Sequence, residues 1–188
     1  MFPDWLTPEQ IARLEGHFEL LTRWNKGLNL TRITDRAEAI ERHYNEGLFL
    51  AQALPVGPLK IADIGSGAGF PGYPIAIARP ECTVTLVESH QRKAAFLREA
   101  SRGVANIRVL AVRAEGCREA FDWTVSRAVS YADLAKGKLL ARLAPHTALL
   151  TGAEEPPDGL GFRWDRTIGV PGSKSRFLRI GHREKCFT

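Results

Sequence analysis

The sequence predicts an α/β protein with a mostly parallel, seven-stranded sheet, an antiparallel last strand and an N-terminal helical extension. Two observations support this prediction. From Leu59 onward, short apolar runs typical of strands alternate with helical stretches, which is the pattern of a parallel sheet covered by helices on both faces. Near the end of the chain, two strand-like runs are joined only by Gly169–Ser173, which leaves no room for a crossover helix and predicts a hairpin.

The bulk composition limits the classes of protein that the chain can belong to. Its 188 residues, 44% hydrophobic and 25% charged, are typical of a single globular domain. The net charge of +5 is compatible with nucleic-acid binding but does not establish it. The three cysteines are far apart, without a metal-binding pair or a disulfide framework. With no signal-peptide pattern and no apolar run of ~20 residues, we expect a cytoplasmic protein that does not enter a membrane.

The first element is a helix whose start is marked by Thr7-Pro8-Glu9-Gln10, where Thr7 is the expected N-cap and Gln10 closes a capping box. Apolar residues at helical spacing follow up to Leu21. Asp35 marks a second helix start, with a buried face expected from Ile40 to Leu48. Because the connector at 54–58 is short, residues 1–54 are expected to pack as an extension on the domain formed by residues 55–188.

The remaining elements follow in alternation. Between and after the strands, helices are expected at 90–102 and 130–143. The expected strands cover 59–64, 83–88, 107–112, 122–127, 146–151, 162–168 and 176–182. Five alternating units closed by a hairpin are the layout of the class I (Rossmann-like) S-adenosylmethionine-dependent methyltransferase fold.

The most informative motif lies between the first two of these strands. It reads Asp63-Ile64-Gly65-Ser66-Gly67-Ala68-Gly69-Phe70-Pro71-Gly72, and glycine at every second position lets the backbone turn sharply against a ligand. Read from Asp63, the motif is D-x-G-x-G-x-G with Pro71 and Pro74 just after it, which is not the usual dinucleotide fingerprint. A carboxylate just before the glycines, at Asp63, would repel a pyrophosphate but accept hydrogen bonds from an amino-acid cation. The motif therefore favours S-adenosylmethionine over NAD.

Four strand ends should meet at one edge of the sheet, because ligands of open parallel sheets lie beyond the carboxyl ends of the strands. There the glycines would lie along the methionine part of the cofactor, and Asp63 would bond either the loop or the ligand amine. Glu88 would accept hydrogen bonds from both ribose hydroxyls. Ala114 and Glu115 would meet the adenine. The alternatives are a plain tight turn for the glycines, a solvated strand end for Glu88 and a helix cap for Glu115. The expected cofactor residues are Asp63, Gly65, Gly67, Gly69, Phe70, Glu88, Ala114, Glu115 and Arg127.

Arg127 lies at the mouth of this expected site, where a guanidinium can hold a phosphate or a carboxylate through two hydrogen bonds. It is the candidate positioning residue, and a structural ion pair is the alternative. The segment Trp24–Arg32 reads as an ordinary helix end, although its composition suits RNA. The basic stretch after Arg163 suits either an RNA-facing edge or a solvated hairpin. His43 and the cysteines are assigned to packing or to the surface.

These residues together resemble the small-subunit (16S) ribosomal RNA guanine-N7 methyltransferases, the family also called glucose-inhibited division protein B. The resemblance implies methyl transfer from S-adenosylmethionine to N7 of a guanine, with 16S rRNA or the small ribosomal subunit as partner, no metal and a monomeric enzyme. It also implies that Gly65, Phe70, Ala114, Glu115 and Arg127 contact the cofactor and that Glu88 is the acidic strand end. The resemblance rests on Trp24-Asn25-Lys26, Asn29-Leu30-Thr31, Arg42-His43, the glycine motif extended by Phe70-Pro71-Gly72, Val84–Ser89, Lys93, Phe96-Leu97, Phe121-Asp122 and Ser126-Arg127-Ala128.

The chain departs from the family pattern at two places. Glu46-Gly47-Leu48 replaces an acidic-Ser-Leu motif, and Thr151-Gly152 stands where the family usually has Lys-Gly. The second departure leaves open a catalytically weakened rRNA-binding module that retains the cofactor fold. A nicotinamide-dependent oxidoreductase is disfavoured, because the motif read from Asp63 is D-x-G-x-G-x-G and the chain has no Tyr-x-x-x-Lys pair.

Overall fold

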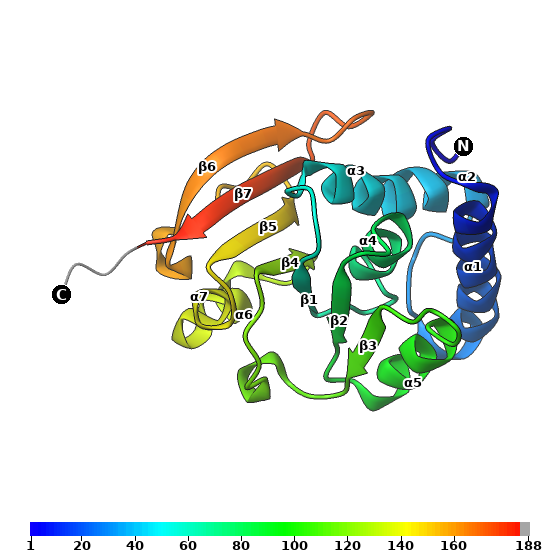
Figure 1. The fold of residues 1–188 in the computed structure, drawn as a ribbon, viewed down its shortest axis with the longest axis horizontal. Coiled ribbons are helices and arrows are strands. Elements are labelled where there is room, and N and C mark those ends of the chain that lie inside the picture. Colours follow the sequence, from blue (N-terminus) through cyan, green and yellow to red (C-terminus); the bar gives the residue numbers. More distant parts are fainter. Residues whose placement is uncertain (185–188) are drawn as a thin grey trace.

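Seven strands form one twisted sheet through the centre of residues 1–184, the part of the chain that this computed structural model describes (Figure 1). Their spatial order is β3-β2-β1-β4-β5-β7-β6. β7 runs antiparallel to β5 and pairs with β6 in a hairpin, whereas the neighbours from β3 to β5 are parallel. The predicted fold class and antiparallel last strand are therefore confirmed. The strands are β1 (Lys60–Ile64), β2 (Thr83–Val87), β3 (Ile107–Leu110), β4 (Trp123–Arg127), β5 (His146–Thr151), β6 (Phe162–Gly169) and β7 (Phe177–Arg183).

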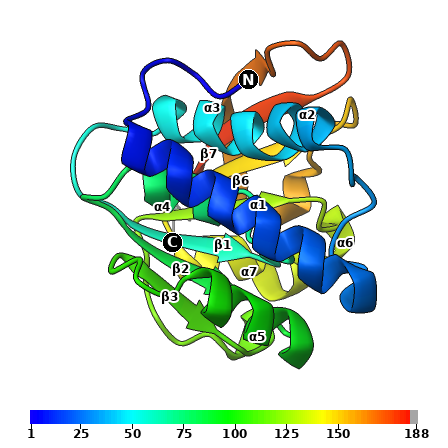
Figure 2. The same ribbon diagram turned by 90° about the vertical axis from the view of Figure 1, so that its right-hand side faces the viewer.

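The central strands are buried on both faces, as parallel strands between two helical layers must be. In β1 and in β2 only the first residue is exposed. Two apolar cores result. One lies under α1, α3, α4 and α5, and the other under α6 and α7 (Figures 1 and 2). The helices are α1 (Pro8–Leu28), α2 (Arg36–Ala39), α3 (Asn45–Ala53), α4 (Gly72–Ala78), α5 (Gln91–Ala100), α6 (Tyr131–Ala135) and α7 (Leu139–Leu143).

Helix α1 begins where its capping box predicts. The Thr7 hydroxyl accepts a hydrogen bond from the Gln10 backbone, and the Gln10 side chain accepts one from the Thr7 backbone. The helix then lies across α4 and α5 (Figure 2). Its buried His17 lies against Gly69 in the loop that follows β1. This packing makes the N-terminal segment part of the surroundings of the site.

The second helical segment also begins as predicted, with the Asp35 side chain accepting from the Glu38 backbone. It continues from α2 through a π-helical turn at Ile40–Tyr44 into α3. Ile40, Tyr44 and Leu48 are all buried, as expected. A π-helical turn shifts the helical register by one residue, and such turns occur frequently at functional sites. Here the turn carries His43.

The prediction of one helix over 130–143 is wrong. The chain forms α6, a 3-10 turn at Lys136–Lys138 and α7. Gly137 and Lys138 both adopt left-handed backbone conformations, with φ of 58° and 50°. Glycine tolerates that conformation, so Gly137 allows the chain to break the helix and turn.

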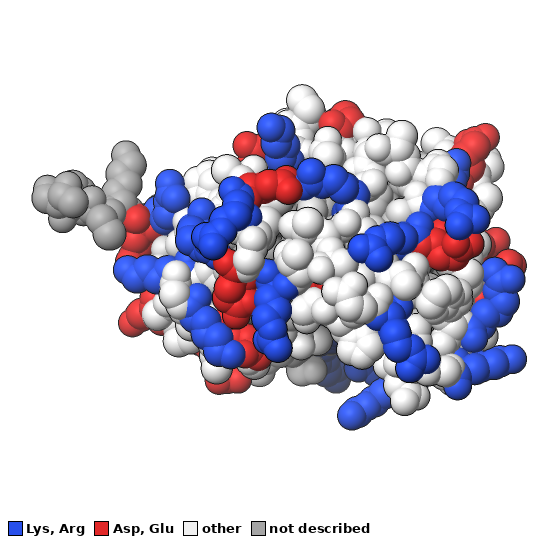
Figure 3. Space-filling model, turned by 90° about the horizontal axis from the view of Figure 1, so that it is seen from below, with Lys and Arg blue, Asp and Glu red and all other residues white. Residues whose placement is uncertain are grey.

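Within residues 1–184, no helix is long and apolar enough to cross a membrane. On the face shown in Figure 3, basic side chains are interspersed with acidic ones and do not form one continuous patch. Lys185 of the C-terminal basic stretch and Cys186, one of the three cysteines, lie outside the described residues.

Candidate active site

The carboxyl ends of β1, β2 and β4 meet at the loop of residues 65–71, named the glycine loop below. Ile64 pairs with Val87 on one side and with Ser126 on the other, so the three strands end at the same level. The backbone N–H groups of Gly65 and Ser66 both donate to the Val87 carbonyl, at 3.0 and 3.1 Å. The glycine loop is thus fastened to the neighbouring strand at its first two residues.

Gly65 and Gly67 need to be glycine for different reasons. Both have positive φ, at 71° and 59°. A Cβ on Gly65 would lie 2.5 Å from the Cγ2 atom of Val129, whereas a Cβ on Gly67 would meet only the Gly65 carbonyl at 3.8 Å. Gly65 therefore allows two chain segments to approach closely. At Gly67 there is free space beside the backbone, and glycine is favoured there by the positive φ.

Gly69 faces the opposite way. Its φ is 92°, and a Cβ there would lie 3.2 Å from both the Nε2 atom of His17 on α1 and the Cβ of Tyr73. The structure therefore separates Gly69 from the other two glycines. It serves the packing of α1 behind the glycine loop.

Asp63 is fully buried and holds the glycine loop closed. Its Oδ2 atom accepts from the Ser66 hydroxyl at 2.6 Å and from the Gly72 backbone at 3.0 Å, and its Oδ1 atom has no hydrogen-bond partner within residues 1–184. Burial raises the pKa of this carboxyl to about 6. The sequence left two roles open for Asp63, a hydrogen bond to the loop or one to the ligand amine. The structure contains the hydrogen bonds to the loop.

Glu88 directly follows β2, and its carboxylate contacts the backbone of the glycine loop. Oε2 accepts from the Gly67 backbone at 2.9 Å, and Oε1 accepts from the His90 backbone at 2.7 Å. The side chain is buried at this point. Because a carboxylate offers about four lone-pair positions, each oxygen can still accept one more hydrogen bond.

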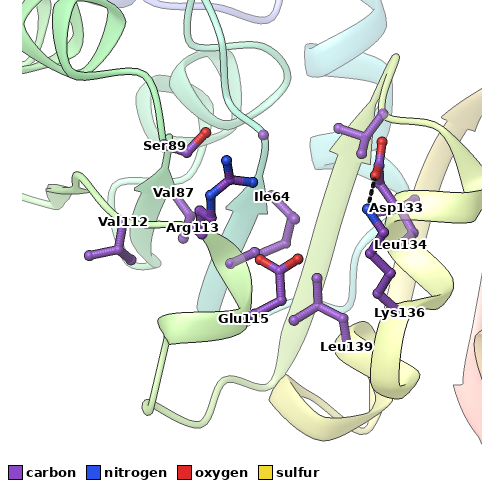
Figure 4. Close-up of a pocket in the computed structure, with 13 residues that line it drawn as sticks. Ile64, Val87, Ser89, Val112, Arg113, Glu115, Asp133, Leu134, Lys136 and Leu139 are labelled. Carbon is purple, nitrogen blue, oxygen red and sulfur yellow. Dashed lines mark hydrogen bonds and ion pairs between the residues drawn. The ribbon is translucent and has the colours of Figure 1, made fainter.

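A cavity of about 230 Å³ opens on one side of Gly65 (Figure 4). Its walls include Ile64 and Leu139, and charged side chains lie at its rim, among them Glu115 and a Lys136–Asp133 ion pair with an Nζ–Oδ1 distance of 2.6 Å. A small cavity with apolar walls and a few charged groups suits an aromatic heterocycle. Ala114 and Glu115 both line this cavity, where the sequence placed them.

A second cavity of about 200 Å³ lies on the other side of Gly65. It is lined by the glycine loop with Phe70, by Arg127, and by residues from outside the predicted set, whose polar members beyond the loop are Thr31, His43 and Lys93. Gly65 belongs to both cavities, so an elongated ligand with a flat end can lie across this one residue.

Phe70 anchors the end of the glycine loop in an aromatic cluster. Its ring stacks on His43 with centroids 4.8 Å apart and meets the edges of Tyr44 and His17 at 4.9 and 5.4 Å. The guanidinium carbon of Arg127 lies 5.3 Å from the ring centroid, which is within the range of a cation–π contact. Three of these four neighbours come from the N-terminal segment.

Arg127 is mostly buried and belongs to a network of charges. Its Nη1 atom donates to the Arg42 carbonyl at 2.7 Å and to Nδ1 of His43 at 2.9 Å, and it lies 3.4 Å from Oε2 of Glu46. Glu46 also pairs with Arg176 at 2.5 Å. Burial is the main influence on Glu46 and raises its pKa, although both arginines oppose that shift. The structural ion pair is therefore present, and it holds Arg127 at the cavity.

A third hollow of about 360 Å³ lies beyond Arg127, at the carboxyl ends of β4 and β5. Arg127 and Ala128 line both this hollow and the second cavity, so the two spaces are neighbours with Arg127 at both. Tyr131, Thr151 and Arg176 form other parts of its wall.

The C-terminal basic stretch does not act as one surface. Arg179 is buried and donates to the Thr151 hydroxyl, to Glu155 and to the carbonyls of Ala153 and Glu154. Arg179 therefore cannot face RNA. Its hydrogen bond also engages the hydroxyl of Thr151, the residue that stands where the family usually has lysine.

Sequence reasoning missed His43 as a member of the site. It is buried and packs on Phe70, so the assignment to packing holds, but it also contacts Arg127 and lines the second cavity. The Arg42-His43 pair was the only signal, and a pair of residues does not reveal which distant strand end it meets. Trp24–Arg32 is a helix end, as predicted, closed by Asn29 in a left-handed conformation.

Comparison with known proteins agrees with this geometry. The chain is 42% identical over 145 residues to the ribosomal RNA small subunit methyltransferase G of Nitrosospira multiformis, covering 73% of this chain and 66% of that protein. It is 42% identical over 134 residues to the protein of the same name from Moorella thermoacetica, covering 66% and 56%. The chain thus matches between about half and two thirds of the length of these curated relatives.

Solved structures share the fold. A SAM-dependent methyltransferase from Aquifex aeolicus superposes with a TM-score of 0.61 at 16% identity, covering 83% of this chain and 97% of that one. The N-methyltransferase NodS from Bradyrhizobium japonicum gives 0.61 at 17% identity, covering 81% and 100%. Residues 10–151 match the family described as rRNA small subunit methyltransferase G. That match covers well over half of the chain, and the chain therefore belongs to the rRNA small subunit methyltransferase G family.

Proposed function

We propose that this chain transfers a methyl group from S-adenosylmethionine to N7 of a guanine in small-subunit (16S) ribosomal RNA. The observation that carries the proposal is a row of three neighbouring hollows. Gly65 lines the first and the second, and Arg127 lines the second and the third, which lies at the ends of β4 and β5. A donor with a flat end and an acceptor base can therefore approach each other beside one guanidinium.

The residues around Gly65 fit the cofactor. The cavity beside Ala114 and Glu115 suits the adenine, and the remaining lone pairs of Glu88 suit the two ribose hydroxyls. The backbone at Gly65 and Gly67 and the side chains of Phe70 and Arg127 suit the methionine part. Asp63 and Gly69 support the glycine loop from behind. When bound, the cofactor supplies an electrophilic methyl group on a sulfonium.

The chain need not remove a proton from the acceptor, because guanine N7 already carries a lone pair. The surrounding groups agree with this requirement. Asp63 is buried behind the loop, and both ring nitrogens of His43 are already engaged. Of the described residues that line the hollow, Glu154 is the one carboxylate, and none carries an imidazole. What remains for the protein is to hold donor and acceptor in line, ~3 Å apart, which is the role proposed for Arg127.

The acceptor guanine should lie in an unpaired or locally opened region. In A-form RNA, N7 faces the deep and narrow major groove, which side chains cannot enter. An extruded base can instead reach the hollow between Tyr131 and Arg176. Residues 1–54 and 55–188 are proposed to act as one unit, since α1 packs behind the glycine loop. A cytoplasmic, metal-free monomer completes the proposal.

Two measurements test the proposal in sequence. The first is calorimetric titration of the purified protein with S-adenosylhomocysteine. The second is transfer of a tritiated methyl group to undermethylated 16S rRNA and 30S particles, with nucleoside analysis of the product. We expect binding and incorporation as 7-methylguanosine.

The negative outcomes separate the parts of the proposal. Absence of binding at millimolar ligand contradicts the cofactor site. Binding without incorporation contradicts the enzymatic activity and favours a binding module with weakened turnover. Thr151, whose hydroxyl accepts from Arg179, would then be the first residue to replace by lysine.

A further inference from the structure

Arg127 is held through one nitrogen only. Its Nη1 atom carries two hydrogens, and the two shortest contacts are with the Arg42 carbonyl at 2.7 Å and Nδ1 of His43 at 2.9 Å. Within residues 1–184, the other guanidinium nitrogens have no protein hydrogen-bond partner. The orientation of the guanidinium toward the two cavities that it lines therefore depends on what accepts from Nη1.

The contacts of His43 decide which of its nitrogens carries the proton. An arginine nitrogen only donates, so Nδ1 of His43 must accept and cannot be protonated. The ring proton then lies on Nε2, which is 2.8 Å from the Thr31 hydroxyl oxygen. That oxygen accepts from Nε2 and also from the Ile33 backbone at 3.0 Å, which uses both of its lone pairs.

Thr31 is itself fixed at the end of α1. The Asn25 side chain accepts from the Thr31 backbone N–H at 2.9 Å and donates to the Thr31 carbonyl at 3.0 Å. Asn25 belongs to the last turn of the helix. A chain of hydrogen bonds thus leads from the end of α1 through Thr31 and His43 to Arg127 on β4.

We propose that His43, held by Thr31 as the Nε2-protonated neutral tautomer, is a positioning residue that orients the Arg127 guanidinium for the reaction. The proposal rests on the proposed function for its consequence in catalysis, but its tautomer can be tested without activity. It also accounts for the Asn25, Thr31 and Arg42-His43 motifs, which the cofactor cavity by itself does not explain.

The charges around His43 favour the neutral ring. Arg42 lies on the same helical segment as His43, Arg127 lies on β4 and Arg176 lies just before β7, and all three cations lower the pKa of His43. The Arg42 backbone opposes this shift, and the carboxylate of Glu46 pairs with Arg127 and Arg176. Burial and these cations lower the pKa of His43 to about 3. A protonated ring would in addition lose the acceptor that Nη1 of Arg127 needs.

The first test is long-range proton–nitrogen NMR on the whole chain with labelled histidine, assigned with a His43→Gln variant. We expect His43 to give the pattern of an Nε2-protonated neutral ring at every pH from 5 to 8. An Nδ1-protonated pattern, or titration of His43 in that range, overturns the proposal. Both outcomes are independent of methyl transfer.

The second test is a double-mutant cycle with kcat/KM for methyl transfer as the readout. Thr31→Val removes the hydroxyl that fixes the tautomer, and a loss of about tenfold is expected for one such hydrogen bond. Thr31→Ser should restore the wild-type value. Thr22→Val is the matched control, because Thr22 lies on the exposed face of α1 and its hydroxyl donates to the Phe18 carbonyl of the same helix.

Arg127→Lys is the second substitution of the cycle, because lysine lacks the planar guanidinium that His43 orients. In that background Thr31→Val should change kcat/KM less than about twofold, since nothing remains to be oriented. A full tenfold loss in both backgrounds indicates a merely structural role and overturns the proposal. If the wild type does not bind S-adenosylhomocysteine, the proposed function fails, whereas the NMR result still decides the tautomer.

Discussion

Glu88 shows how one side chain can serve the loop and a ligand together. Its two oxygens already accept from the backbones of Gly67 and His90. The carboxylate therefore shapes the glycine loop before any ligand arrives, and a bound ribose would use the lone pairs that remain. A substitution at this position should disturb both roles.

We expect Glu88→Ala to weaken binding of S-adenosylhomocysteine by at least about 100-fold, because two charge-assisted hydrogen bonds are each worth about 1.5–3 kcal/mol. Glu88→Gln should fall between this variant and the wild type, since its one carbonyl oxygen can satisfy only one of the two backbone donors. Calorimetric titration measures both. The control is Glu19→Gln on exposed α1, and wild-type affinity in Glu88→Ala would refute the ribose assignment.

Gly65 provides a second prediction at this scale. An alanine Cβ would lie 2.5 Å from Cγ2 of Val129 and would sit on a backbone with φ of 71°. We expect Gly65→Ala to lower the melting temperature and to abolish measurable cofactor binding. Adding Val129→Ala removes the clashing methyl and should restore part of the loss, leaving about 1–2 kcal/mol for the left-handed backbone. No recovery in the double variant would mean that the steric argument is wrong.

At the scale of elements, local signals predicted helix starts well and the break in a helix badly. Thr7 and Asp35 were recognised because a cap acts on residues two or three positions away. The break at Gly137 was missed because one glycine inside an apolar periodic stretch is compatible with a continuous helix. Its conformation depends on how α6 and α7 pack against the sheet.

The candidate site likewise has residues that local sequence signals predict and residues that they do not. The glycine loop, Glu88 and Arg127 could be found from sequence, because each follows a recognisable strand and parallel strands end at one edge. His43 and Glu46 could not be linked to Arg127, which is more than eighty residues away in the chain. Such contacts are created by packing of the N-terminal helices on the sheet, and no local pattern encodes them.

Two glycine substitutions test this view of the helices. Gly16 lies in α1 with no atom within 4 Å of its added Cβ, so Gly16→Ala should stabilise the protein by about 1 kcal/mol through helix propensity. Gly137 is equally open but has φ of 58°, so Gly137→Ala should destabilise it by about 1–2 kcal/mol. Urea unfolding gives both values. Shifts of the same sign would show that the backbone conformation at Gly137 is not what matters.

At the scale of the whole molecule, two buried histidines link the N-terminal helices to the glycine loop. His17 on α1 accepts or donates at the Tyr44 hydroxyl, 2.7 Å away, and lies against Gly69 and Phe70. Burial lowers the pKa of His17 to about 3, and burial together with Arg127 does the same for His43. Asp63 behaves oppositely, because burial raises its pKa to about 6.

These shifts predict how stability depends on pH. Below pH 6.5 the unfolded chain binds a proton at each of the two histidines while the folded chain does not, so the stability present above pH 6.5 is lost as the pH falls toward 3. Each histidine contributes a slope of about 1.4 kcal/mol per pH unit. Between pH 6 and 4 the folded chain takes up a proton at Asp63 before the unfolded chain does, which offsets about one of the two slopes.

The variant His17→Asn isolates one of these contributions. An amide can keep the hydrogen bond to the Tyr44 hydroxyl but cannot take up a proton in this range, so the slope between pH 6.5 and 4 should flatten by about 1.4 kcal/mol per pH unit. Urea unfolding at several pH values measures the slope, and His90→Asn controls for the substitution itself at an exposed position. An unchanged slope in His17→Asn would show that His17 does not stay neutral in the folded protein. The link from α1 to the glycine loop would then have to rest on packing alone.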